Sequence, residues 1–134
     1  MILAGTSGLL SLYNRREPTH PSVAEAVAQE PGPFVVSPYV IAELDYLVAT
    51  RLGTDAEQRV LAELASPAYV LASVDRDDLR ACIELISRYA GIGVTDASML
   101  VLADRLGNDR VLALDRRHFE TVRTPSGRAL AIMP

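Results

Sequence analysis

The sequence predicts a three-layer α/β sandwich in which a central parallel sheet is flanked by helices. Two observations predict it: short strand-like apolar runs alternate with longer segments of helical periodicity, and no repeat or low-complexity tract interrupts them. Strands interleaved with helices pair in parallel, because each helix returns the chain across a face of the sheet. At 134 residues, the chain is expected to form a single domain, 1–134, with a core that needs no disulfide.

The elements are expected in a regular order along the chain. Strands are predicted at Ile2–Ala4, Phe34–Val36, Tyr69–Ser73 and Val111–Leu114, with a weaker one at Ala129–Ile132. Helices are predicted at Gly8–Asn14, Ser22–Gln29, Pro38–Arg51, Asp55–Ala65, Arg76–Tyr89 and Asp96–Leu106. Four capping signals mark helix starts: Ser37 before Pro38, a capping box from Thr54 to Glu57, Asp75 and Thr95.

Composition excludes several classes of protein. The net charge of −4 argues against a protein that coats nucleic acid, since such binding depends mainly on phosphate neutralisation. No apolar run approaches a membrane span, so a cytoplasmic protein is expected. All 13 cations are arginine, and the absent lysine rules out a receiver-type signalling domain. No P-loop or dinucleotide-binding motif is present.

Three acids are predicted to lie near one edge of the sheet. In an open parallel sheet, ligands bind beyond the carboxyl ends of the strands, and both Gly5 and Asp115 follow a strand directly. Asp96 opens a helix on its inward-facing stripe, and Glu43 lies on the flank of another apolar stripe. Carboxylates gathered in this way hold a hard divalent cation, so the pattern predicts a metal-dependent nuclease.

Each acid also has a structural explanation when it is taken alone. Asp96 fits a first-turn residue stabilised by the helix dipole, and Glu43 fits a solvated edge acid. Asp115 could begin a turn, and Ser7 is favoured as a cap of the first helix. The order and spacing of the acids together are more specific than any one of them.

The motifs resemble those of PIN-domain ribonucleases, and among them VapC-type toxins of bacterial toxin–antitoxin pairs. The resemblance covers nearly the whole chain. It rests on the first strand with Thr6-Ser7-Gly8-Leu9-Leu10, on Val36-Ser37-Pro38 with Ala42-Glu43-Leu44, on Thr95-Asp96-Ala97, and on Leu114-Asp115-Arg116-Arg117-His118-Phe119. It implies a PIN-like fold and an endoribonuclease that uses Mg²⁺ or Mn²⁺ to cleave structured RNA such as tRNA or rRNA.

The resemblance also implies which residues bind the metal. Three of the family's four acids map onto Glu43, Asp96 and Asp115, as catalytic residues and metal ligands. The fourth, an aspartate before Thr-Ser, maps onto Gly5, which has no side-chain oxygen. We therefore expect impaired or absent activity, from an engineered change or from a naturally degenerate copy. The alternative is an inactive binding module that an antitoxin holds or that binds RNA without cleaving it.

Arginines near the acids are candidates for RNA contact. Arg15 and Arg16 follow the first helix, while Arg116 and Arg117 follow Asp115, so all four are expected toward the catalytic edge. They are equally consistent with solvated charge pairs. His118 could donate a proton, although a surface or capping role is the favoured interpretation.

The resemblance further implies protein partners. VapC-type proteins pair into a homodimer and take up a cognate VapB-type antitoxin, whose segment covers the acidic groove. Apolar residues from the helices around Val40–Val48 and Val60–Leu64 are expected at the surface, where an amphipathic partner helix would use them.

Overall fold

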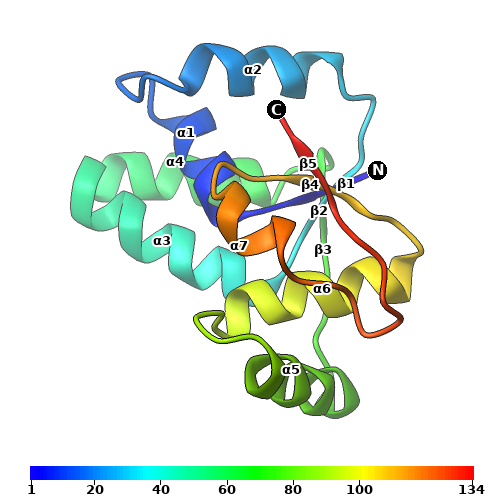
Figure 1. Ribbon diagram of the computed structural model, residues 1–134. Helices are drawn as coiled ribbons and strands as arrows, with labels where there is room; N and C mark the ends of the chain where they lie inside the picture. Colours follow the sequence, from blue (N-terminus) through cyan, green and yellow to red (C-terminus); the bar gives the residue numbers. More distant parts are fainter.

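The computed structural model describes residues 1–134 and contains one five-stranded parallel sheet in the order β3-β2-β1-β4-β5 (Figure 1). The strands are β1 Ile2–Ala4, β2 Phe34–Val36, β3 Tyr69–Leu71, β4 Arg110–Leu112 and β5 Ala131–Met133. Central β1 pairs with β2 on one side and β4 on the other, so Leu3 lies beside Val35 and Val111. The strand order reverses beside β1, which is where ligands bind in open sheets of this kind.

Seven helices surround the sheet, which confirms the predicted three-layer sandwich. They are α1 Thr6–Tyr13, α2 His20–Gln29, α3 Pro38–Leu52, α4 Thr54–Leu64, α5 Arg76–Arg88, α6 Val94–Leu106 and α7 Arg116–Glu120. Figure 1 shows α2 on one side of the sheet and α5 with α6 on the other. None of these helices has the length and apolar content that a membrane crossing requires. The short helix α7 was not among the predicted elements.

The predicted helix starts are only partly correct. The Ser37 hydroxyl accepts a hydrogen bond from the Tyr39 amide (3.2 Å), and Asp75 forms a capping box with Asp78. The box predicted at Thr54 is wrong, because Gly53 is the N-cap of α4 and makes no side-chain cap. Thr95 is also not a cap, since α6 already begins at Val94.

The core lies on both faces of the sheet, as the alternation of strand side chains requires. Ile2 and Leu112 pack with Val23 of α2, while Leu3 and Val111 belong to a larger cluster with α1, α3 and α6. The prediction that Val40–Val48 and Val60–Leu64 expose apolar residues is largely wrong. Five of their apolar side chains are buried where α3 and α4 pack on each other and on the core: Val40, Leu44, Val48, Val60 and Leu64. The large apolar side chains that remain exposed in these segments are Tyr46 and Leu61.

Close packing between α1 and β4 requires a glycine in the helix. A Cβ atom at Gly8 would lie 2.8 Å from the Leu112 carbonyl oxygen and 2.8 Å from its Cγ atom, so a side chain here would displace the strand. The helix therefore lies directly against the end of β4. This contact brings the residues after β1 next to those after β4.

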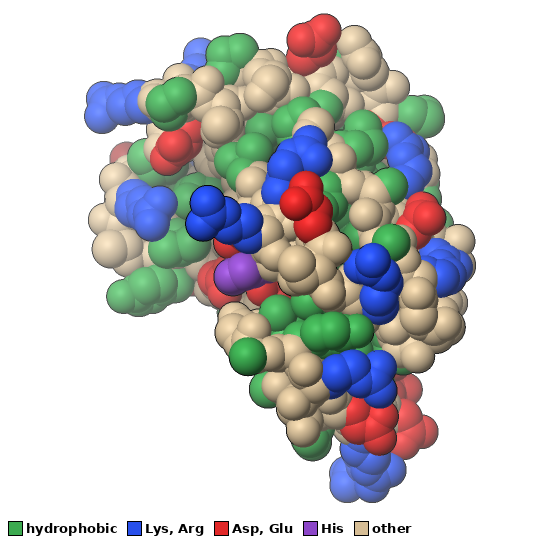
Figure 2. Space-filling view, viewed as in Figure 1, with side chains coloured by type: hydrophobic (Ala, Val, Ile, Leu, Met, Phe, Trp, Pro, Cys, Tyr) green, Lys and Arg blue, Asp and Glu red, His purple; other side chains and the backbone are tan.

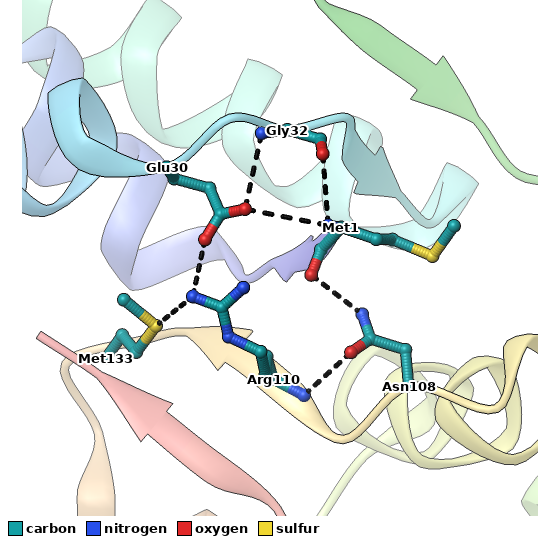
Figure 3. Close-up of polar contacts among 6 residues, drawn as sticks. All are labelled: Met1, Glu30, Gly32, Asn108, Arg110 and Met133. Atoms are coloured by element: carbon teal, nitrogen blue, oxygen red, sulfur yellow. Dashed lines mark hydrogen bonds and ion pairs between the residues drawn. The ribbon is translucent and has the colours of Figure 1, made fainter.

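At the amino-terminal edge of the sheet, a buried carboxylate joins several strands (Figure 3). The Glu30 side chain is 1% exposed and lies 2.5 Å from the Arg110 guanidinium of β4 and 3.5 Å from the Met1 ammonium. The Gly32 amide donates to the same carboxylate (3.2 Å), and Asn108 donates to the Met1 carbonyl (3.1 Å). Burial would raise the pKa of Glu30, but the hydrogen bonds and charges of these partners hold that pKa below its usual range.

We expect Glu30→Gln to lower the melting temperature at neutral pH, because the Arg110 guanidinium and the Met1 ammonium then lose the negative charge with which they pair. Since the pKa is lower in the folded than in the unfolded chain, this stabilisation is present above about pH 4.5 and is lost as the pH falls through the folded value. Thermal unfolding of both proteins across this range measures the effect. Glu25→Gln, an exposed position of α2, is the control and should melt like the unmodified chain. A melting-temperature difference for Glu30→Gln that stays constant on acidification would contradict this account.

Candidate active site

A pocket of about 310 Å³ opens at the carboxyl-terminal edge of the sheet, beside β1. Its walls come from the segment after β1, from α3, from the loop and first turns of α6, and from α7. The lining residues are Gly5, Thr6, Ser7, Glu43, Gly91, Gly93, Thr95, Asp96, Met99, Asp115, His118 and Phe119. The three predicted acids and Gly5 thus lie in one pocket, although four separate segments of the chain carry them.

Two of the acids converge on one histidine. The His118 Nδ1 atom lies 3.2 Å from Asp96 Oδ2 and 3.3 Å from Asp115 Oδ2. Figure 2 shows a histidine beside acidic and arginine side chains on this face of the molecule. The favoured prediction for His118, a surface or capping role, is therefore incomplete. Its side chain is 46% exposed, yet it bridges two candidate catalytic acids.

The pocket disfavours a charge on Asp96. Burial raises the pKa of its carboxyl above the usual value, and the negative charges of Glu43 and Asp115 raise it further. The charge and hydrogen bond of His118 lower that pKa and offset part of this effect. Ionisation of Asp96 therefore lowers the stability of the folded state, as is common for groups that serve a function rather than stability.

Position 5 is closely surrounded. The Gly5 amide donates to the Leu112 carbonyl (2.9 Å), and a Cβ atom at this position would lie 3.0 Å from that oxygen and 3.3 Å from Met99 Cε. A side chain here would require a small shift of the flexible Met99 end and of the strand. The neighbouring Thr6 Oγ1 atom is buried and has no hydrogen-bond partner, although it belongs to a residue that lines the pocket.

Hydroxyl groups fix the elements that carry the acids. Ser7 Oγ accepts a hydrogen bond from the Leu114 amide (2.9 Å), which holds the chain just before Asp115. Ser7 does not cap α1, so the favoured prediction for this residue is wrong. Ser37 Oγ is 2.7 Å from Ser98 Oγ, and Ser98 donates to the Thr95 carbonyl (2.7 Å).

The buried Ser37–Ser98 contact links the start of α3 to α6. These helices carry Glu43 and Asp96, so the two hydroxyl groups help to set the relative position of the two acids. Ser98 cannot be recognised from the sequence, because nothing in the local pattern distinguishes it from an ordinary helix serine.

The donor atoms of the pocket fit a hard divalent cation. Asp96 and Asp115 both direct a carboxylate oxygen at the His118 Nδ1 atom, Glu43 lines the same pocket, and Thr6 has a buried oxygen without a partner. Oxygen donors of this kind suit Mg²⁺ or Mn²⁺. In this structure, no group of three acidic, histidine or cysteine side chains lies close enough together to hold an ion. The assignment of these acids as ligands remains a prediction.

The first pair of predicted RNA-binding arginines does not reach the acids. Arg15 lines a separate groove between α1 and α4, where it accompanies Arg59 and Glu63. Arg16 is exposed on the loop between α1 and α2. Neither arginine lines the acidic pocket, because α1 separates them from the residues that follow β1, and their contact with RNA stays a prediction.

The second pair divides between two environments. Arg116 forms an ion pair with Glu120 (3.9 Å) and donates to the Pro134 carbonyl, so it is turned toward the end of the chain. Arg117 is exposed and lines a second pocket that shares His118 with the acidic one. Of the four arginines, Arg117 is the one best placed to contact a ligand that reaches the acids.

Comparison with known families gives a consistent result. A family model described as PIN domain matches residues 2–124. The chain is also similar to Ribonuclease VapC26 of Mycobacterium tuberculosis, with 42% identity over 135 residues, 99% of this chain and 100% of that protein.

Solved structures support the fold. M. tuberculosis VapC20, described as a sarcin–ricin loop cleaving toxin, has a TM-score of 0.86 at 20% identity and full coverage of both chains. A toxin–antitoxin complex from Klebsiella pneumoniae gives 0.73 at 17% identity, over 91% of this chain and 92% of that one. VapBC2 of Rickettsia felis, bound to a promoter DNA fragment, gives 0.71 at 19% identity with full coverage of both chains.

We expect Asp96→Asn to stabilise the metal-free protein at neutral pH, because it removes a carboxylate that burial and two neighbouring charges disfavour. Each kcal/mol gained would raise the melting temperature of a domain this size by roughly 3–5 °C. The pKa is raised in the folded state, so the gain should shrink as the pH falls toward the unfolded value and both proteins carry a neutral group. Thermal unfolding in a chelator measures it, with exposed Asp109→Asn as the control. A lower melting temperature for Asp96→Asn at neutral pH would show that the carboxylate stabilises the pocket instead.

Proposed function

Because this chain belongs to the PIN-domain family and to its VapC-type members, we propose that it is a toxin-type endoribonuclease that cleaves structured RNA with a divalent cation. One observation carries the proposal. Glu43, Asp96 and Asp115, from three different elements, line one pocket beside the central strand. An ionised Asp96 is unfavourable in the metal-free pocket, and a bound cation would offset that cost.

Asp96, Asp115 and Glu43 would hold the cation, Mg²⁺ or Mn²⁺, while Thr6, which lines the same pocket, has a buried Oγ1 atom without a hydrogen-bond partner. When bound, such an ion supplies an activated water and offsets the charge that develops on the phosphate oxygens. His118 touches Asp96 and Asp115 and is half-exposed, so it would orient both carboxylates and face an incoming phosphate. Gly5 contributes no ligand, which leaves the set one carboxylate short.

Structured RNA, such as tRNA or rRNA, is the proposed substrate class, and the cytoplasm is its proposed place of action. VapC26 is a ribonuclease, and VapC20 is described as cleaving the sarcin–ricin loop, which supports a folded RNA over a random single strand. Arg117 lies beside the acidic pocket and carries no ion pair with the protein, so it would contact the RNA backbone.

A VapB-type antitoxin is the proposed protein partner. Two of the solved structures that share this fold are a toxin–antitoxin complex and a VapBC assembly. A homodimer is proposed from the family resemblance. The exposed apolar side chains available to such partners include Tyr46 of α3, Leu61 of α4 and Ile83 of α5.

We expect the unmodified chain to cleave RNA very slowly or not at all, because one preorganised metal ligand is missing. Loss of a single such electrostatic contact commonly costs on the order of 10²–10³ in rate. Gly5→Asp should therefore raise Mg²⁺- or Mn²⁺-dependent cleavage of tRNA or rRNA by at least about 100-fold. Adding Asp96→Asn to that variant should abolish the gain. Gel analysis of RNA fragments over time measures both.

Gly5→Ala is the matched control, because it adds the same Cβ atom near Leu112 and Met99 without a carboxylate. It should remain inactive, and its melting temperature reports the steric cost that Gly5→Asp shares. Strong cleavage by the unmodified chain would refute position 5 as a key ligand. A folded Gly5→Asp variant that gains no activity would favour the inactive binding module, which the missing oxygen at Gly5 already makes the second candidate.

A further inference from the structure

A second pocket, of about 260 Å³, adjoins the acidic one. It lies between the end of α5 and α7, and His118 lines both pockets. Its lining residues are Arg88, Tyr89, Ala90, Ile92, Arg117, His118, Thr121 and Val122. None of them is acidic, so this pocket is locally cationic in a chain whose net charge is −4. A ligand that fills both pockets would pass His118.

The two arginines of this pocket have no partner within the protein. Neither guanidinium of Arg88 or Arg117 forms an ion pair or a hydrogen bond, whereas Arg105 is paired with Asp78 and Arg116 with Glu120. Arg88 in the last turn of α5 is favourable for the helix dipole, but that dipole does not explain Arg117, which approaches from α7. Two guanidinium groups without a protein partner that line one pocket are both free to bind an anion there.

The rest of the pocket suits the uncharged part of a nucleotide. Ile92 and Val122 are buried apolar residues of its lining, and Tyr89, which is half-buried, lines it too. Tyrosine and arginine side chains are the surfaces on which unstacked RNA bases pack. The pocket therefore combines a phosphate site with a surface for a base or ribose.

We propose that this pocket binds the nucleotide next to the scissile phosphate, with Arg88 and Arg117 on its phosphate and Tyr89 against its base or sugar. The proposal rests on the proposed ribonuclease function, since it assigns the neighbouring acidic pocket to the scissile phosphate. It adds a residue, Arg88, that no motif of the sequence marks.

The test is the salt dependence of RNA binding. Anisotropy of a fluorescently labelled RNA hairpin, at a fixed calcium concentration and increasing potassium chloride, gives the affinity and its slope against salt. Each lost phosphate contact in a single-stranded loop should reduce that slope by about 0.7. We expect this reduction, with a several-fold weaker affinity, for both Arg88→Gln and Arg117→Gln. Arg76→Gln is the matched control, because Arg76 is exposed and unpaired at the opposite end of α5.

The outcomes separate this subsite from the ribonuclease function itself. If the unmodified chain binds the hairpin but Arg88→Gln and Arg117→Gln lose no more than Arg76→Gln, the subsite is overturned and RNA binding stands. If the unmodified chain binds no RNA, both proposals fail. All three arginines are exposed, and thermal unfolding of the three variants shows whether a loss of affinity comes from a loss of stability.

Discussion

The candidate site depends on one unfavourable interaction, the repulsion between carboxylates that the fold holds close together. Asp96, Asp115 and Glu43 share one pocket beside β1, where burial and mutual repulsion disfavour the charged form of Asp96. His118 lies within 3.3 Å of two of these carboxylates and relieves part of the repulsion. A fold that served stability alone would not gather these acids. This gathering of acids is the observation on which the proposed cation site rests.

The rest of the fold holds this pocket open and in register. Gly8 allows α1 to lie directly on β4, Ser7 fixes the backbone before Asp115, and the Ser37–Ser98 contact joins the two helices that carry the other acids. At the opposite edge of the sheet, a buried Glu30 is stabilised by the charges around it. The two edges thus place carboxylates in contrasting environments: Glu30 is paired with cations, while His118 offsets only part of what disfavours a charge on Asp96.

Sequence reasoning could predict what depends on local pattern. Strand–helix alternation predicted the sheet, and strand ends predicted where Asp115 and Gly5 would lie. Such reasoning failed where contacts with other parts of the fold determine the role of a residue. A glycine took the cap position expected of Thr54. The apolar stripes of α3 and α4 proved to face each other and the core rather than a partner, because periodicity shows that a stripe is apolar but not what covers it. Ser98 gains its role from its contact with Ser37, in a distant segment of the chain, which no motif encodes.

The central proposal is that the three acids form a cation site that lacks one ligand at Gly5. Electron paramagnetic resonance of Mn²⁺ tests it most directly, since the signal of the free ion falls as the ion binds, whether or not any RNA is cleaved. The account predicts one weak site in the unmodified chain, no binding by Asp96→Asn, and tighter binding by Gly5→Asp. Equal Mn²⁺ uptake by the unmodified chain and by Asp96→Asn would contradict it.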